Sequence, residues 1–85
     1  MKTIYKYPIE ITDKQEIQMP FGAEVIHAGL DPQGMPCLWA TVESANSPEP
    51  VLVGVVGTGN PMPLHAERHV GSFVQGPFMW HVFLG

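Results

Sequence analysis

The sequence contains a single cysteine, Cys37, among its 85 residues. One cysteine cannot form a disulfide within the chain, and such sparse cysteine usage is typical of proteins from reducing compartments. A chain this short also cannot divide into two parts that each bury a core. We therefore expect one domain over residues 1–85, stabilised by tight packing or by a partner subunit.

Charged residues are also scarce, at 14% of the chain, whereas hydrophobic residues make up 45%. A monomer of this composition would leave apolar patches exposed, and such patches usually mark interfaces, so we expect a homo-oligomer. The chain has only four lysines and arginines against eight acidic residues. These are too few cations to neutralise the phosphates of duplex nucleic acid. A small phosphorylated ligand remains compatible with the charge, because backbone amides can bind phosphate.

No segment resembles a targeting or membrane sequence. Lys2 and Lys6 are followed by no apolar run of the kind that a signal peptide contains. No uncharged apolar run approaches the roughly 18 residues that a membrane-spanning helix needs. The sequence predicts a protein without a membrane partner.

Nine glycines and nine prolines interrupt every window in which a helix could form. The pattern instead predicts an all-β domain, a small antiparallel sandwich or partly open barrel of about six to seven short strands. The expected strands are residues 3–11, 16–19, 23–30, 35–43, 51–56, 69–75 and 78–84.

Turn chemistry and apolar runs suggest how some strands are arranged. Residues 3–11 and 16–19 are expected to pair as a hairpin with a short loop. Asp31-Pro32-Gln33-Gly34 has the residue preferences of a type I turn. The apolar run 51–56 predicts a strand buried on both faces, and Pro48 and Pro50 are expected to stop pairing before it. Residues 78–84 have two apolar faces, which predicts a central strand or an oligomer contact.

The segment 57–69, GTGNPMPLHAERH, contains more residues of types common in binding and catalytic sites than any other part of the chain. Its glycines resemble a phosphate-binding loop, but the third glycine and following helix of a dinucleotide site are absent, as is the lysine of a P-loop. Two interpretations remain open. The segment is an ordinary turn at the end of a strand, or its amides form an anion-binding concavity in which Thr58 and Asn60 contact a ligand.

His65 and His69 are spaced by four residues, as two zinc ligands on one helical turn would be. The glutamate that metalloproteases place after the first histidine is replaced by alanine, and the cysteines of zinc deaminases are missing. We therefore predict no metal, although a site of these histidines and a carboxylate remains an alternative to solvated imidazoles. Arg68 is the only arginine and could grip a phosphate or carboxylate bidentately.

Aromatic and remaining polar residues complete the candidate site. Trp39 and Trp80 could stack on a planar ligand, although large aromatic side chains are more often core fillers. His27 and His81 fall within strands and are expected to be core or interface residues, and Cys37 to be a buried, inert thiol. No catalytic set or cofactor site is recognisable, so the sequence favours a binding protein over an enzyme. The expected ligand-binding residues are Thr58, Asn60, His65, Arg68, His69, Trp39 and Trp80.

Three blocks cover most of the chain. They are TIYKYPIEITDKQEIQMPFGAEVIHAG with GMPCLWATV, then VGTGNP, and then HVGSFVQGPFMWHVF. They resemble a family of small hypothetical proteins encoded by tailed bacteriophages. The resemblance implies a protein made in the bacterial host cytoplasm, where small phage proteins often act against host defences. One such class binds nucleotide immune signals as homo-oligomers and withholds them. We therefore expect sequestration of a small nucleotide-derived signal, with a module that binds a host protein, a minor structural protein or an enzyme as alternatives.

Overall fold

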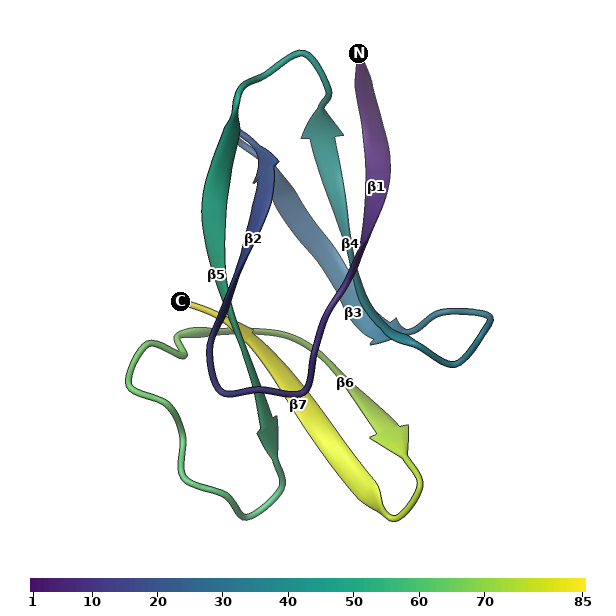
Figure 1. Cartoon of the computed structure of the whole chain (residues 1–85), viewed down its shortest axis with the longest axis vertical. Helices are drawn as coiled ribbons and strands as arrows, with labels where there is room; N and C mark the ends of the chain where they lie inside the picture. The colour runs from purple at the N-terminus through teal and green to yellow at the C-terminus, as the bar shows by residue number, and fades with distance from the viewer.

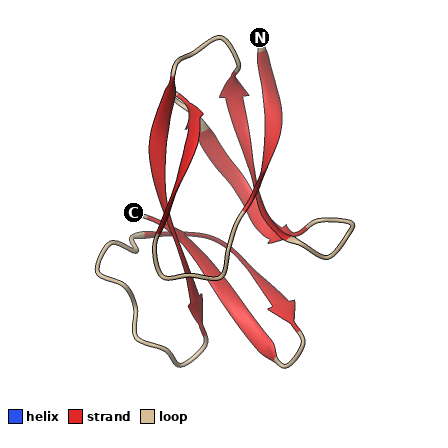
Figure 2. Ribbon diagram, in the orientation of Figure 1, coloured by secondary structure: helices blue, strands red, loops and turns tan.

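The computed structural model describes all of residues 1–85 and contains seven strands and no helix (Figures 1 and 2). Alternating side chains and frequent turn residues suit strands, which need only two residues per side-chain repeat. The strands are β1 (Lys2–Pro8), β2 (Gln15–Pro20), β3 (Glu24–Leu30), β4 (Pro36–Glu43), β5 (Pro48–Gly57), β6 (Arg68–Gln75) and β7 (Phe78–Leu84). The predicted all-β fold is confirmed. Because the fold has no helix, none is available to cross a membrane.

All seven strands belong to one sheet with the order β1-β4-β3-β6-β7-β5-β2. Neighbouring strands are antiparallel except β3 and β6, which run parallel. The sheet curls until it nearly closes into a barrel, with β1 and β2 as its two free edges (Figure 1). Of the two predicted architectures, the partly open barrel is therefore the one that forms.

The predicted hairpin between the first two strands is wrong. β1 pairs with β4, and β2 pairs with β5 at the other edge of the sheet. The connecting segment is too long for a tight turn, and Ile9 within it is buried while its amide donates to the Pro36 carbonyl at 3.0 Å. This anchor keeps the chain alongside the β3–β4 connection, so that β2 finds its partner in β5 and not in β1.

The predicted turn at Asp31–Gly34 is confirmed. The Gly34 amide donates to the Asp31 carbonyl at 2.8 Å, and Gly34 has a φ of 81°, which glycine adopts without strain. The Asp31 side chain adds two bonds, since its Oδ1 accepts the amides of Gln33 and Met35 at 2.9 Å each. Local hydrogen bonding therefore determines this turn.

Strand β5 begins earlier than its apolar run. Pro48 and Pro50 were expected to stop pairing, but both lie within β5 opposite β2. Proline is tolerated where no ladder hydrogen bond is required of its nitrogen. Of the run 51–56 that was predicted to be buried, residues 53–56 are buried, whereas Val51 and Leu52 are half-buried.

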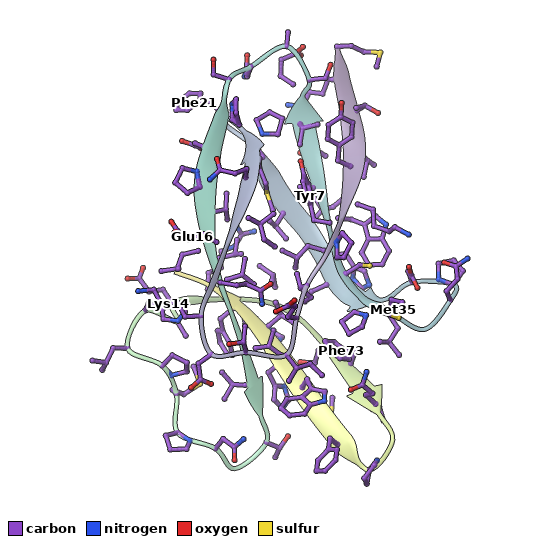
Figure 3. The ribbon with its side chains drawn as sticks, viewed as in Figure 1. Tyr7, Lys14, Glu16, Phe21, Met35 and Phe73 are labelled. Carbon is purple, nitrogen blue, oxygen red and sulfur yellow. The ribbon has the colours of Figure 1, made fainter.

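The core lies inside the curled sheet and is built by inward-facing side chains from every strand except β1. Val82 is fully buried there, whereas its neighbours His81 and Phe83 point to the opposite face of β7. β7 lies between β6 and β5, which confirms the prediction of a central strand. The core residues are Ile9, Met19, Val25, Ala28, Leu38, Ala40, Val42, Val53, Val55, Phe73 (labelled in Figure 3) and Val82.

One close contact joins the two halves of the sheet. β3 and β6 run parallel with Ala28 opposite Gly71. A Cβ on Gly71 would lie 2.9 Å from the Ala28 Cβ and would collide with the Ala28 carbonyl oxygen. Gly71 therefore permits the backbone approach that brings β6 and β7 against β3 and β4.

Candidate functional site

Two hollows meet at the turn that follows β5. The first, here called the histidine hollow, has a volume of about 230 Å³ and is lined by Val56, Gly57, Thr58, Gly59, Asn60, Met62, His81 and Phe83. The second, here called the aromatic hollow, has a volume of about 240 Å³ and is lined by Gly57, Thr58, Asn60, Pro77, Phe78, Met79 and Trp80. Gly57, Thr58 and Asn60 border both, so this turn is the centre of the candidate site.

Hydrogen bonds within the turn use most of its amides. The Thr58 amide donates to the Met79 carbonyl at 3.2 Å, and the Asn60 amide donates to the Gly57 carbonyl at 3.0 Å. Gly59 has a φ of 89°, and its amide makes no hydrogen bond in the protein. The turn therefore offers one free amide, together with the side chains of Thr58 and Asn60, where the sequence had suggested a full concavity of amides.

Gly57 is required by close packing in the turn. A Cβ at this position would lie 2.9 Å from the Asn60 Nδ2 and 3.0 Å from the Trp80 ring. Without a side chain, the turn folds back so that Asn60 and Trp80 come close to the same backbone. This glycine connects the polar and aromatic parts of the site.

Four side chains beside the histidine hollow form a continuous chain, here called the histidine relay. Thr58 Oγ1 lies 2.7 Å from His81 Nε2, and His81 Nδ1 lies 2.8 Å from Ser72 Oγ. Ser72 Oγ in turn lies 2.9 Å from His69 Nε2. The relay thus links the turn after β5 to β7 and β6.

A β-bulge in β6 makes the relay possible. The register of β6 against β7 shifts between His69 and Gly71. Residues three apart on a regular strand point to opposite faces, but the extra residue of a bulge brings them to the same face. His69 and Ser72 therefore both reach the face of His81, where the His69 ring also packs on Phe83 with centroids 5.3 Å apart.

The aromatic hollow presents two rings at the β6–β7 hairpin. The Phe78 and Trp80 rings have centroids 5.8 Å apart and planes inclined by 38°. Phe78 is 59% exposed, whereas Trp80 is half-buried against the core and its Nε1 is buried without a hydrogen-bond partner. None of the residues that line this hollow is acidic or basic.

His65 is held away from the hollows. Its Nε2 lies 2.7 Å from the Asp13 carbonyl, and its ring packs over Gly54, where a Cβ would lie 2.9 Å from it. The single helical turn considered for His65 and His69 does not form, because His65 lies in a turn and His69 in β6. The structure contains no group of three or more histidine, cysteine or acidic side chains that could hold a metal ion.

Arg68 and Trp39 also lie apart from the turn. Arg68 pairs with Leu84, whereas Gly57 pairs with Trp80. Four residues along a strand correspond to about 13 Å, so Arg68 lies at the other end of β7. Its Nη2 donates to the Val25 carbonyl at 3.4 Å.

Trp39 lies on β4, separated from β7 by β3 and β6, and stacks with His27 at a centroid distance of 5.4 Å. Of the seven residues predicted to bind a ligand, the structure gathers Thr58, Asn60, His69 and Trp80 near the turn. It places His65, Arg68 and Trp39 elsewhere.

The groups with shifted pKa values belong to a second polar cluster, distant from the hollows. The pKa of Asp31 is lowered, first by the Met35 amide and then by Lys6, whose Nζ donates to Asp31 Oδ2 at 3.0 Å. The same carboxylate raises the pKa of Lys6. Burial is the main cause that raises the pKa of the Cys37 thiol, in agreement with the predicted inert cysteine.

Sequence reasoning missed Ser72 and Phe78 and assigned His81 to a core or interface role. The alternation along 78–84 does place His81 beside Phe83, so its face was predictable. The bulge that brings Ser72 to the same face leaves no recognisable sign in HVGSFVQ except its glycine, and isolated glycines in strands often mark bulges.

Comparison with known proteins adds a family but no activity. No curated protein and no solved structure matches the chain. One family model, described as a domain of unknown function (DUF7352), matches residues 1–85. The match covers the whole nearly closed, seven-stranded sheet, and the chain therefore belongs to the DUF7352 family.

Proposed function

We propose that this protein binds a small nucleotide-derived signal as a homo-oligomer and withholds it without cleaving it. The observation that carries the proposal is the aromatic hollow, where Phe78 and Trp80 adjoin Thr58 and Asn60. Aromatic side chains stack on nucleobases, and hydroxyl and amide groups bind their polar edges or phosphates. This is the combination that a neutral binding site for a nucleotide requires.

The lining of this hollow favours binding over cleavage. General acid–base catalysis needs a titratable group within hydrogen-bond reach of the reacting atoms. The aromatic hollow has no acidic, histidine, lysine or arginine side chain in its lining. A ligand stacked there would meet side chains that orient it, and no acidic or basic side chain that could act as a general acid or base lines the hollow.

Exposed apolar side chains around the turn support the homo-oligomer. Met62, Leu64, Val74, Phe78 and Met79 are all exposed, and they lie on the β5–β6 connection and the β6–β7 hairpin. Each hollow is also smaller than the roughly 300–1,000 Å³ of pockets that enclose drug-sized ligands. A second subunit packed on these side chains would cover them and close the hollow around a ligand.

The resemblance to small proteins of tailed phages supplies the biological setting of the proposal. A phage protein with a neutral nucleotide site, made in the host cytoplasm, would lower the free concentration of a host immune signal. A module that docks on a host protein by adding a strand to β7 is less well supported, because both edges of β7 are already paired.

The test is retention and recovery of the ligand. Purified protein is incubated with cyclic dinucleotides and cyclic ADP-ribose isomers, washed, and then heated to release what it holds. Recovery of intact nucleotide supports sequestration, whereas recovery of an altered nucleotide indicates an enzyme. Failure to retain any of these nucleotides would refute the proposal.

A matched pair of variants locates the site. Phe78→Ala removes an exposed ring of the aromatic hollow, and Phe21→Ala removes a ring of similar exposure, 64% against 59%. Figure 3 shows Phe21 at the opposite end of the molecule from the β6–β7 hairpin. Loss of one stacked ring is expected to weaken retention about 5- to 150-fold for Phe78→Ala. Phe21→Ala is expected to retain the ligand like the unmodified protein.

A further inference from the structure

Two arrangements of hydrogen fit the distances in the histidine relay. A neutral imidazole has one donor and one acceptor nitrogen. In the first, His81 Nε2 donates to Thr58, whose hydroxyl can then donate to the Met79 carbonyl at 3.4 Å. In the second, Nε2 accepts and the hydroxyl donates over 2.7 Å. Only the second arrangement lets His81 accept the proton of Thr58, so it is the one that a reaction at Thr58 requires.

The remaining members of the relay follow from that assignment. His81 Nδ1 then carries hydrogen and donates to Ser72 Oγ at 2.8 Å, and the Ser72 hydroxyl donates to His69 Nε2 at 2.9 Å. Every donor in the histidine relay faces one acceptor. In this arrangement Ser72 and His69 support the His81 tautomer whose free lone pair points at Thr58.

From this geometry we infer that Thr58 is a nucleophile, that His81 is its general base, and that small carboxylic esters are substrates. A hydroxyl within hydrogen-bond reach of a histidine, with the histidine oriented by a third group, is the arrangement that activates a nucleophile. Thr58 is exposed, so a substrate can reach its Oγ1. Ser72 and His69 are positioning residues, because they act through His81.

The histidine hollow matches an ester in shape and polarity. Val56, Met62 and Phe83 provide an apolar side that suits a short acyl chain. The volume of about 230 Å³ limits that chain to a few carbons. On the polar side, the Gly59 amide and the Asn60 side-chain amide make no hydrogen bonds within the protein. Both are available as donors to the oxyanion that forms when an ester carbonyl is attacked.

The reaction balances with water as the only co-reactant. Thr58 Oγ1 attacks the carbonyl carbon while its proton passes to His81 Nε2, and the carbonyl electron pair moves to oxygen. Collapse of the tetrahedral intermediate breaks the bond to the alcohol, which leaves with the proton from His81. Water then attacks the acyl-Thr58 ester with the help of His81, releases the carboxylic acid and restores the threonine.

Ser72 and His69, the side chains that orient His81, are uncharged, and this limits the range of substrates. Hydrolases of this kind usually place a carboxylate there, which stabilises the imidazolium. Here a hydroxyl and a second imidazole, whose ring centroid lies 6.4 Å from that of His81, provide no negative charge. We expect slow turnover that is confined to esters with good leaving groups.

The experiment uses the full-length protein with p-nitrophenyl acetate as the probe. Nitrophenolate release is followed by absorbance, and peptide mapping by mass spectrometry locates acetyl groups. Acetyl-Thr58 is the expected adduct, while acetyl groups on lysines and the N-terminal amine serve as the internal background. Acetylation of those amines alone would overturn the inference, and this outcome is decided on the unmodified protein without any variant.

Variants then separate the base from the positioning residues. His81→Gln is expected to lower the rate of Thr58 acetylation by about 100-fold or more, since general-base catalysis contributes at least that factor. Ser72→Ala is expected to lower it less, and Ser72→Thr, which keeps the hydroxyl, to restore it. Thr58→Val should abolish the site-specific product, whereas the matched change Thr41→Val on β4 should not. An unchanged rate in His81→Gln would overturn the assignment of the base.

This inference goes beyond the proposed nucleotide binding and can fail separately from it. Ester reactivity is measured without a nucleotide and depends on His81, which does not line the aromatic hollow. Nucleotide retention depends on Phe78, which does not line the histidine hollow. Phe21→Ala, at a residue that lines neither hollow, is expected to leave the rate of Thr58 acetylation unchanged.

Discussion

Replacing Gly71 by alanine tests whether the stability of the sheet depends on the close backbone approach between β3 and β6, which joins its two halves. The new Cβ would collide with the Ala28 carbonyl oxygen and lie 3.0 Å from the Ala28 amide nitrogen. These are backbone atoms of Ala28, which is buried, so no flexible side chain can move aside. Gly71 does not have a positive φ, and the expected effect is therefore steric and not conformational.

The expected loss of stability in Gly71→Ala follows from the contacts that must change. Overpacking at a rigid site costs about 1–3 kcal/mol, and each weakened backbone hydrogen bond costs about 0.5–1.5 kcal/mol. Reduced entropy of the unfolded chain offsets about 0.4–1 kcal/mol. We expect Gly71→Ala to lower the free energy of unfolding by about 2–3 kcal/mol. For a domain of this size, the melting temperature should fall by roughly 10–20 °C.

The assay is urea and thermal unfolding followed by tryptophan fluorescence and circular dichroism. Trp39 in β4 and Trp80 in β7 report on the two halves of the sheet that the β3–β6 contact joins.

Gly29→Ala is the matched control, because Gly29 is also a strand glycine without a positive φ, but the atoms that its Cβ would meet belong to the His27 side chain. That ring is exposed and can rotate, so the control should change stability by less than about 1 kcal/mol. If Gly71→Ala proved as stable as Gly29→Ala, the role assigned to the close approach would be wrong.

Three further predictions follow from the second polar cluster and from the placement of the arginine. Cys37, which is 1% exposed and whose thiol pKa is raised by burial, should not react with a thiol reagent in the folded protein but should react fully after unfolding in urea. Because the pKa of Asp31 is lowered by folding, its charged form stabilises the protein above about pH 4, and this contribution is lost as the pH falls. Asp31→Asn should therefore lower the urea midpoint at pH 7 and reduce its further loss between pH 5 and 3, and an acid dependence equal to that of the unmodified protein would contradict this reasoning. Arg68→Ala should weaken nucleotide retention no more than Lys6→Ala does, because Arg68 lies at the far end of β7 from the turn; a selective loss in Arg68→Ala would place the ligand elsewhere.

The strands were largely predictable because their signals are local. Glycine and proline mark where pairing must end, and side chains alternate between faces with a period of two. The strand 78–84, with Val82 inside and His81 outside, follows directly from that alternation. The turn at Asp31–Gly34 was predictable for the same reason, since its hydrogen bonds all lie within five consecutive residues.

Strand partners were not predictable from such signals. β1 and β2 are adjacent in sequence but form opposite edges of the sheet, because each has a better buried partner far along the chain. Pairing depends on the total apolar surface that the closed sheet buries, and no local pattern encodes that sum.

The sequence by itself determined an all-β domain of short strands and drew attention to the glycine turn with Thr58 and Asn60, because turn chemistry and periodicity depend on neighbouring residues. Only the tertiary structure decided which side chains meet that turn. His81 and Ser72 reach it through strand register and a bulge, while Arg68, ten residues from Thr58 in the sequence, is carried to the other end of β7. Contacts between strands depend on how the whole sheet closes, so a residue near in sequence can be distant and a distant one can be the partner.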